Sequence, residues 1–132
     1  MTTPTTLTAV DHTRPWSLNA ERSDHWRRHR EKTREARERW AWLWMAAGAK
    51  QLHLDVVEVI AQPSYKARPQ DTGACYGSVK AAIDALVDVG CIPGDTGKHV
   101  LAITMLAPLA GVDGLTISAL SCAPPTPLDD HR

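Results

Sequence analysis

The chain has 132 residues, with 15 Lys or Arg balanced by 15 Asp or Glu, so its formal net charge is zero and no overall positive field attracts nucleic acid. This length suits one domain with a substantial core. Because the three cysteines lack metal-ligand spacing and no signal peptide or apolar run of roughly 18 residues is present, we expect a cytoplasmic protein, encoded by a cell or a phage, without membrane contact.

The first part of the chain predicts one strand followed by a surface loop. Residues 1–13 should be a loose lead-in with a strand at about 7–10. Residues 14–19 begin with Arg-Pro-Trp, and the proline favours an extended loop over the surface. Asn19, at the end of this loop, is expected near the active edge of the protein.

A long helix is predicted next, from Ser23 or Asp24 to about Ala47. Either of the first two residues can cap the helix, and Gly48 follows its last turn. The second half is amphipathic, with apolar residues at spacings of three and four. This apolar face consists of Ala36, Trp40, Leu43, Trp44 and Ala47.

Positive charge is concentrated in the same segment. Between Arg22 and Arg39 there are eight Lys or Arg against four acidic residues. Such a segment can bind the phosphates of nucleic acid, although the interleaved glutamates would equally make it an ordinary solvated helix. Trp26 and Trp42 lie away from the apolar face, where they could stack on unpaired bases or contact a partner subunit.

A strand is predicted at 51–61, because apolar and polar residues alternate there. It leads into a loop at 63–69 that contains two prolines. Lys66 and Arg68 in this loop suit contacts to a phosphate, although a solvated turn would also explain them.

Two aspartates flank the next predicted helix, residues 79–89, which is amphipathic and is followed by Gly90. Asp71 precedes this helix and Asp95 follows it. A helix of about three turns reverses the chain, so the two flanking loops can reach a common edge of a sheet. Two close carboxylates repel each other unless a cation lies between them, and Mg²⁺ prefers such ligands. The pair indicates either a metal site for phosphodiester chemistry or two turn residues beside glycines.

The last ordered part should be a hairpin. Residues 100–107 and 115–120 are rich in β-forming residues, and the glycine-containing loop between them suits an antiparallel hairpin. Residues 122–132, with three prolines and two aspartates, should be a disordered tail. The predicted fold class is α+β: a small mixed β-sheet with helices packed on one face, in a domain covering residues 14–121.

The segment Lys80-Ala-Ala-Ile-Asp84-Ala-Leu, with Gly90 and Asp95 after it, resembles the RusA family of Holliday-junction resolvases. In that family an Asp-x-Asp-Asn segment leads into a helix beginning Lys-Ala-x-x-Asp-Ala-Leu, and a further Asp follows a turn that ends with Gly. Asp71 matches the first motif aspartate, Lys80 the helix lysine and Asp95 the distal aspartate. The likeness covers most of residues 14–121.

This chain departs from the family pattern just before the helix. Gly73 and Ala74 stand where the family has its second Asp and its Asn, and about three extra residues separate this segment from Lys80. One expected metal ligand is therefore missing or comes from elsewhere. Glu58, on the preceding predicted strand, is a candidate for it.

The resemblance implies a homodimeric, Mg²⁺-dependent endodeoxyribonuclease, with Mn²⁺ as a substitute, that resolves branched double-stranded DNA in recombination and repair. Asp71 and Asp95 would hold the metal, and Lys80 would stabilise charge on the scissile phosphate, although an ion pair with Asp84 is its simpler use. The alternatives are a junction-binding protein with weak cleavage, or an interaction domain whose basic helix docks an acidic partner. The expected DNA-contacting residues are Asn19, Arg27, Arg28, Arg30, Lys32, Arg34, Lys66 and Arg68.

Overall fold

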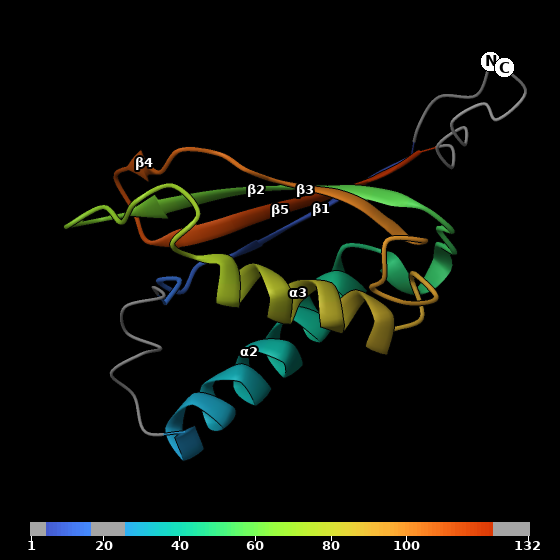
Figure 1. The fold of residues 1–132 in the computed structure, drawn as a ribbon, viewed down its shortest axis with the longest axis horizontal. Coiled ribbons are helices and arrows are strands. Elements are labelled where there is room, and N and C mark those ends of the chain that lie inside the picture. The colour runs from blue at the N-terminus through green and yellow to red at the C-terminus, as the bar shows by residue number, and fades with distance from the viewer. Residues whose placement is uncertain (1–4, 17–25, 123–132) are drawn as a thin grey trace, which may run out of the picture.

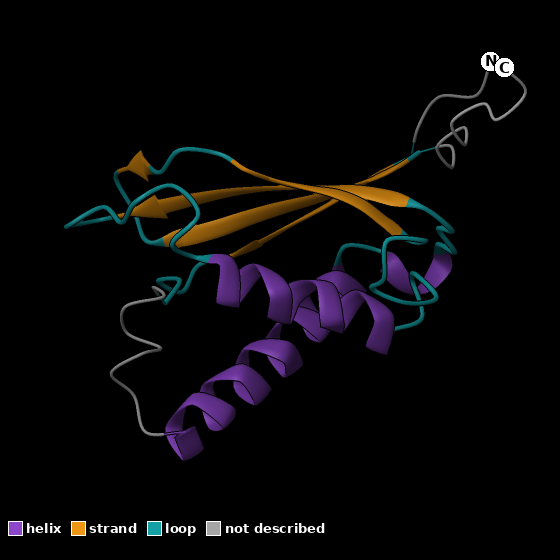
Figure 2. Ribbon diagram, in the orientation of Figure 1, coloured by secondary structure: helices purple, strands orange, loops and turns teal. Residues whose placement is uncertain are grey.

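The computed structural model describes residues 5–16 and 26–122, and Figure 1 shows how its elements are arranged. Both long helices lie on one face of a five-stranded mixed sheet (Figure 2). The predicted α+β class, with helices packed on one face, is therefore confirmed. In chain order the elements are β1 (Thr6–Asp11), α2 (Trp26–Ala46), the 3-10 turn η1 (Ala49–Gln51), β2 (Val57–Tyr65), α3 (Tyr76–Asp88), β3 (Val100–Met105), β4 (Leu109–Ala110) and β5 (Gly114–Ser121).

The strand order is β1-β5-β2-β3, and β4 pairs with the end of β2. β5 runs antiparallel to both β1 and β2, whereas β3 is parallel to β2. The predicted hairpin between residues 100–107 and 115–120 is therefore wrong. Leu115, Ile117 and Ala119 alternate along β5 and are all buried. β5 lies between β1 and β2, and the helices cover this apolar face of the strand (Figure 2).

β2 begins later and ends later than predicted. It runs through Pro63 to Tyr65, both of which are buried on the same face as Val57. The residues before it do not form a strand, although Leu54 is buried and its N–H donates to the Cys91 carbonyl at 2.8 Å. The apolar and polar residues that alternate before Val57 therefore belong to an irregular segment, in which Leu54 is buried although it pairs with no strand.

The buried face of α2 agrees with its predicted apolar stripe. Trp40 and Trp44 are fully buried with ring centroids 5.3 Å apart, and the Trp44 indole N–H donates to the Ala82 carbonyl of α3 at 2.9 Å. Ala47 is exposed because the helix ends before it. No residue from 27 to 35 is buried, so the first half of α2 extends beyond the sheet (Figure 1).

α3 connects two parallel strands, and this decides where its flanking loops lie. It begins at Tyr76, three residues earlier than predicted, and Gly90 follows its end with φ +79°. Since β2 and β3 are parallel, the segment 66–75 leaves the last residue of β2 at one end of the strands, and the segment 89–99 enters β3 at the opposite end (Figure 1). The expected common edge is therefore wrong.

Some predictions concern residues outside the described part of the chain. These are the helix caps at Ser23 and Asp24, Asn19, and the tail after Cys122. Within the described residues, no helix has both the length and the apolar character needed to cross a membrane.

Candidate active site and nucleic-acid interface

Asp95 reaches Lys80 because the segment 89–99 folds back along α3. The Lys80 ammonium donates a hydrogen bond to Asp84 Oδ1 at 2.8 Å and a second one to Asp95 Oδ2. The contact with Asp84 is the predicted pair one helical turn apart, and it is confirmed. The structure thus joins the motif lysine and the distal aspartate, which are 15 residues apart in the sequence.

The charges in this cluster reinforce one another. Burial lowers the pKa of Lys80, but its hydrogen bonds to Asp84 and Asp95 outweigh burial and raise that pKa above its ordinary value. The same hydrogen bond from Lys80 lowers the pKa of Asp95. Both shifts favour the charged forms of Lys80 and Asp95.

This donor set is compatible with a divalent cation. Asp84 and Asp95 already converge on one positive group, and carboxylate oxygens are the ligands that Mg²⁺ prefers. Among residues 5–16 and 26–122, no group of three or more His, Cys, Asp or Glu side chains is arranged to hold a metal ion. A Mg²⁺ ion here would thus use few protein ligands and complete its shell with water and phosphate oxygens, as it commonly does.

Asp71 lies apart from this cluster, in the turn before α3. Its carbonyl accepts a hydrogen bond from the Ala74 N–H at 3.0 Å, and its side chain is exposed. In the described part of the chain, neither a hydrogen bond nor an ion pair joins the Asp71 carboxylate to Lys80 or Asp95. Gly73 has φ +86°, a conformation that residues with a side chain rarely adopt, so the turn itself favours glycine over the second aspartate of the family.

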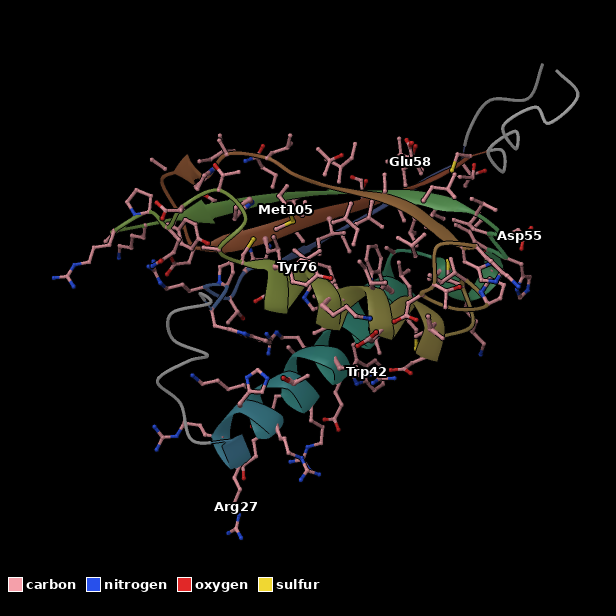
Figure 3. All side chains as sticks on the ribbon, viewed as in Figure 1. Arg27, Trp42, Asp55, Glu58, Tyr76 and Met105 are labelled. Atoms are coloured by element: carbon pink, nitrogen blue, oxygen red, sulfur yellow. The ribbon has the colours of Figure 1, made fainter. Side chains whose placement is uncertain are left out.

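Glu58, the residue considered as a further metal ligand, lies far from the Lys80 cluster. It is exposed on β2, and Figure 3 shows it on the face of the sheet away from the helices that carry Tyr76 and Trp42. The Lys80 cluster lies on the helical side. The prediction that Glu58 could supply a metal ligand is therefore wrong, because successive side chains of β2 point to opposite faces of the sheet (Figure 3).

One flank of α2 is a stripe of arginines that leads toward α3. Arg27, Arg30, Arg34 and Arg37 follow one another at spacings of three and four, and all line a groove of about 640 Å³. Arg37 forms a bidentate salt bridge with Asp88 of α3: its Nε donates to Oδ2 at 2.5 Å and its Nη2 donates to Oδ1 at 2.6 Å. The arginine stripe therefore extends along α2 from Arg27 to the contact with α3 at Asp88.

Arg37 also interacts electrostatically with two residues of the Lys80 cluster. Its hydrogen bond to Asp88 raises the pKa of Arg37 and lowers that of Asp88, and Asp84 and Asp95 add to the field at Arg37. This arginine was absent from the predicted DNA contacts. The periodic continuation of the arginines would have indicated it.

The other predicted DNA contacts lie on the second flank of α2 and in the loop after β2. Lys32 is partly buried and Arg28 is exposed on that flank, whereas Lys66 and Arg68 are exposed in the loop. Arg14 holds the loop: its Nη1 and Nη2 donate to the carbonyls of Ala67 and Arg68 at 2.9 and 3.0 Å. Sequence reasoning missed this role of Arg14 because the contact spans more than 50 residues.

The aromatic residues divide as their spacing predicted. Trp42 is 72% exposed on α2, in contrast to the buried Trp40 and Trp44. The side chain of Trp26 lies outside the described part of the structure. Comparison with known proteins adds no family: the sequence matches no family model and has no significant match among curated proteins.

Proposed function

We propose that this protein is a RusA-like endonuclease that cuts branched double-stranded DNA in a Mg²⁺-dependent reaction. The observation that carries the proposal is the hydrogen bond from Lys80 to Asp95, because these residues match the lysine and the distal aspartate of the RusA motif. The arginine stripe of α2 supports it, since it begins beyond the sheet and ends at Asp88, on the helix that carries Lys80.

Each group has a role that follows from its chemistry. Asp95 and Asp84 would hold Mg²⁺, whereas Asp71, which lies apart from them in the turn before α3, is not assigned to the metal. The metal, when bound, activates water and stabilises the leaving oxygen. Lys80 neutralises the negative charge that develops on the scissile phosphate, and the half-exposed position of its ammonium leaves it within reach of a substrate.

Binding of the DNA backbone is assigned to the two flanks of α2 and to the loop after β2. Arginine and lysine side chains there neutralise phosphates and release counterions, so affinity should fall steeply with added salt. A four-way junction has two-fold symmetry and needs two cuts. We therefore include a homodimer in the proposal, with one active site for each cut.

The test is cleavage of a labelled four-way junction with and without Mg²⁺, in the parent protein and in Asp95→Asn. We expect paired, metal-dependent nicks in the parent and none in the variant. Asp55→Asn is the matched control, because the Asp55 side chain is 81% exposed and lies outside the proposed machinery. Cleavage that survives in Asp95→Asn would refute the proposal.

The replacement of two family positions by Gly73 and Ala74 favours one alternative. A protein of the same fold could bind junctions with weak or no cleavage. It would bind branched DNA in preference to linear DNA, with an affinity that falls as salt is added, and it would make no nicks in Mg²⁺ or in Mn²⁺. A protein that ignores DNA altogether would instead support an interaction domain that docks an acidic partner through α2.

A further inference from the structure

A second cavity, of about 400 Å³, lies on the other flank of α2, against the segment that follows β1. Its volume is within the range of small-molecule sites in proteins. Six of the side chains that line it carry the following argument: Arg14, Trp16, Lys32, Glu35, Arg39 and Gln70. They combine three cations, one carboxylate, one indole and one amide.

Two of the cations are fixed in position before any ligand arrives. Arg39 Nε donates to Asp11 Oδ2 at 2.8 Å, and Asp11 is only 5% exposed and also accepts a hydrogen bond from the Thr13 N–H. Arg14 is held by the carbonyls of the loop after β2 and lies 4.8 Å above the ring of Tyr65. Groups positioned in this way lose little entropy when they bind an anion.

The other groups suit a nucleobase. Trp16 is partly buried, and its backbone N–H donates to Ser78 Oγ of α3 at 3.3 Å, so the indole is anchored next to the helix. A base can stack on an indole whatever its sequence. The Gln70 amide can both donate to and accept from a base edge.

We propose that this cavity binds one unstacked nucleotide of branched DNA, with its phosphate near Lys32 and Arg39 and its base against Trp16. The inference rests on the proposed function and extends it, because it states how a branch is distinguished from a duplex. A base inside a duplex cannot enter such a cavity without leaving its stack. The free energy needed for unstacking is smaller for a base at a branch point. Nucleotides at a junction therefore bind in preference to those in linear DNA.

Glu35 provides a sensitive check on where the phosphate lies. Its carboxylate lines the same cavity and repels a phosphate there, so removing its charge should strengthen binding. Glu38 is exposed on the same helix and lines neither cavity, which makes it the matched control. For Lys32 the matched control is Lys50, exposed beyond the end of α2.

The experiment titrates the full chain with thymidine monophosphate, thymidine or inorganic phosphate and follows ¹⁵N-labelled indole signals by NMR. Trp16→Phe identifies the Trp16 signal. We expect the monophosphate to shift this signal and to bind more tightly than either fragment. Lys32→Gln should weaken that binding about fivefold and Glu35→Gln should strengthen it about threefold, while Lys50→Gln and Glu38→Gln leave it unchanged.

An unmoved Trp16 signal, or variants that equal their controls, would overturn the inference. Equal affinity for inorganic phosphate and for the monophosphate would overturn the assignment of the base to Trp16. Junction cleavage without monophosphate binding removes this inference and leaves the proposed function intact. Monophosphate binding without cleavage of any branched DNA supports the cavity and removes the proposed nuclease.

Discussion

Lys80→Gln should strengthen the binding of a divalent cation while it weakens cleavage. In the structure the Lys80 ammonium satisfies both Asp84 and Asp95, so a metal ion must compete with it for the same carboxylates. Glutamine keeps most of the side-chain length and removes the charge. The variant therefore leaves two carboxylates together without their internal counter-ion.

The size of the effect follows from Coulomb's law. Two unit charges about 4 Å apart interact with about 1 kcal/mol in water and about 4 kcal/mol at an effective dielectric constant near 20. The side chains of Lys80 and Asp95 are 41% and 39% exposed, so the lower part of this range applies. A loss of about 1.4 kcal/mol of competition corresponds to about tenfold tighter binding of Mn²⁺. Cleavage should fall about 100-fold, because the charge on the scissile phosphate loses its partner.

Mn²⁺ binding measured by electron paramagnetic resonance, together with junction cleavage, tests both halves of this prediction. Lys98→Gln is the control, since Lys98 is an exposed lysine of the same 89–99 segment. An unchanged or weaker Mn²⁺ affinity in Lys80→Gln, with Lys98→Gln equal to the parent, would show that Asp84 and Asp95 do not form the metal site. Urea unfolding of the variant checks that any change is not a loss of folding.

Three further predictions concern stability, measured by urea unfolding. Trp44→Ala should cost about 3–5 kcal/mol, because Trp44 is fully buried, whereas Trp42→Ala should cost less than about 0.5 kcal/mol. Gly73→Asp, which restores the family residue, should cost about 1 kcal/mol because φ is +86°. Arg37 lowers the pKa of Asp88 in the folded state. The stability from this pair is thus complete above the ordinary aspartate pKa of 3.8 and is lost as the pH falls through the lowered value. Asp88→Asn should flatten this acidic dependence.

Local patterns predicted the helices well, because amphipathic spacing reports directly on the face that a helix buries. Trp40 and Trp44 show this for α2, whose buried face matched the prediction except at its end. Strand pairing was not predictable in the same way. β5 pairs with β1 over more than 100 residues of sequence, and no local turn signal reveals such a partner. The hairpin was expected because only neighbouring segments could be compared.

In the candidate site, too, contacts within one helix were predictable from the sequence, whereas contacts that depend on the packing of separate elements were not. The pair of Lys80 and Asp84 follows from helix periodicity, and Asp95 joined them through a motif resemblance rather than through spacing. The position of Asp71 was misjudged because the parallel arrangement of β2 and β3 cannot be read from either strand alone. The contact of Arg37 with Asp88 was also missed, since it depends on how α2 packs against α3.

The charges around α2 explain how a chain with zero net charge can be suited to a polyanion. Glu31, Glu35 and Glu38, at spacings of four and three, form an exposed ridge, while the cations lie on the two flanks that border the two cavities. DNA lying across the ridge would meet carboxylates. We therefore expect the backbone to contact the flanks, with α2 inserted between two strands that diverge at a branch. Because Glu31 and Glu35 also line the two cavities, Glu38→Gln tests the ridge alone, and it should strengthen binding of linear duplex more than that of a junction, a difference that competition binding measures directly. Equal strengthening of both would mean that α2 contacts DNA through its outer face.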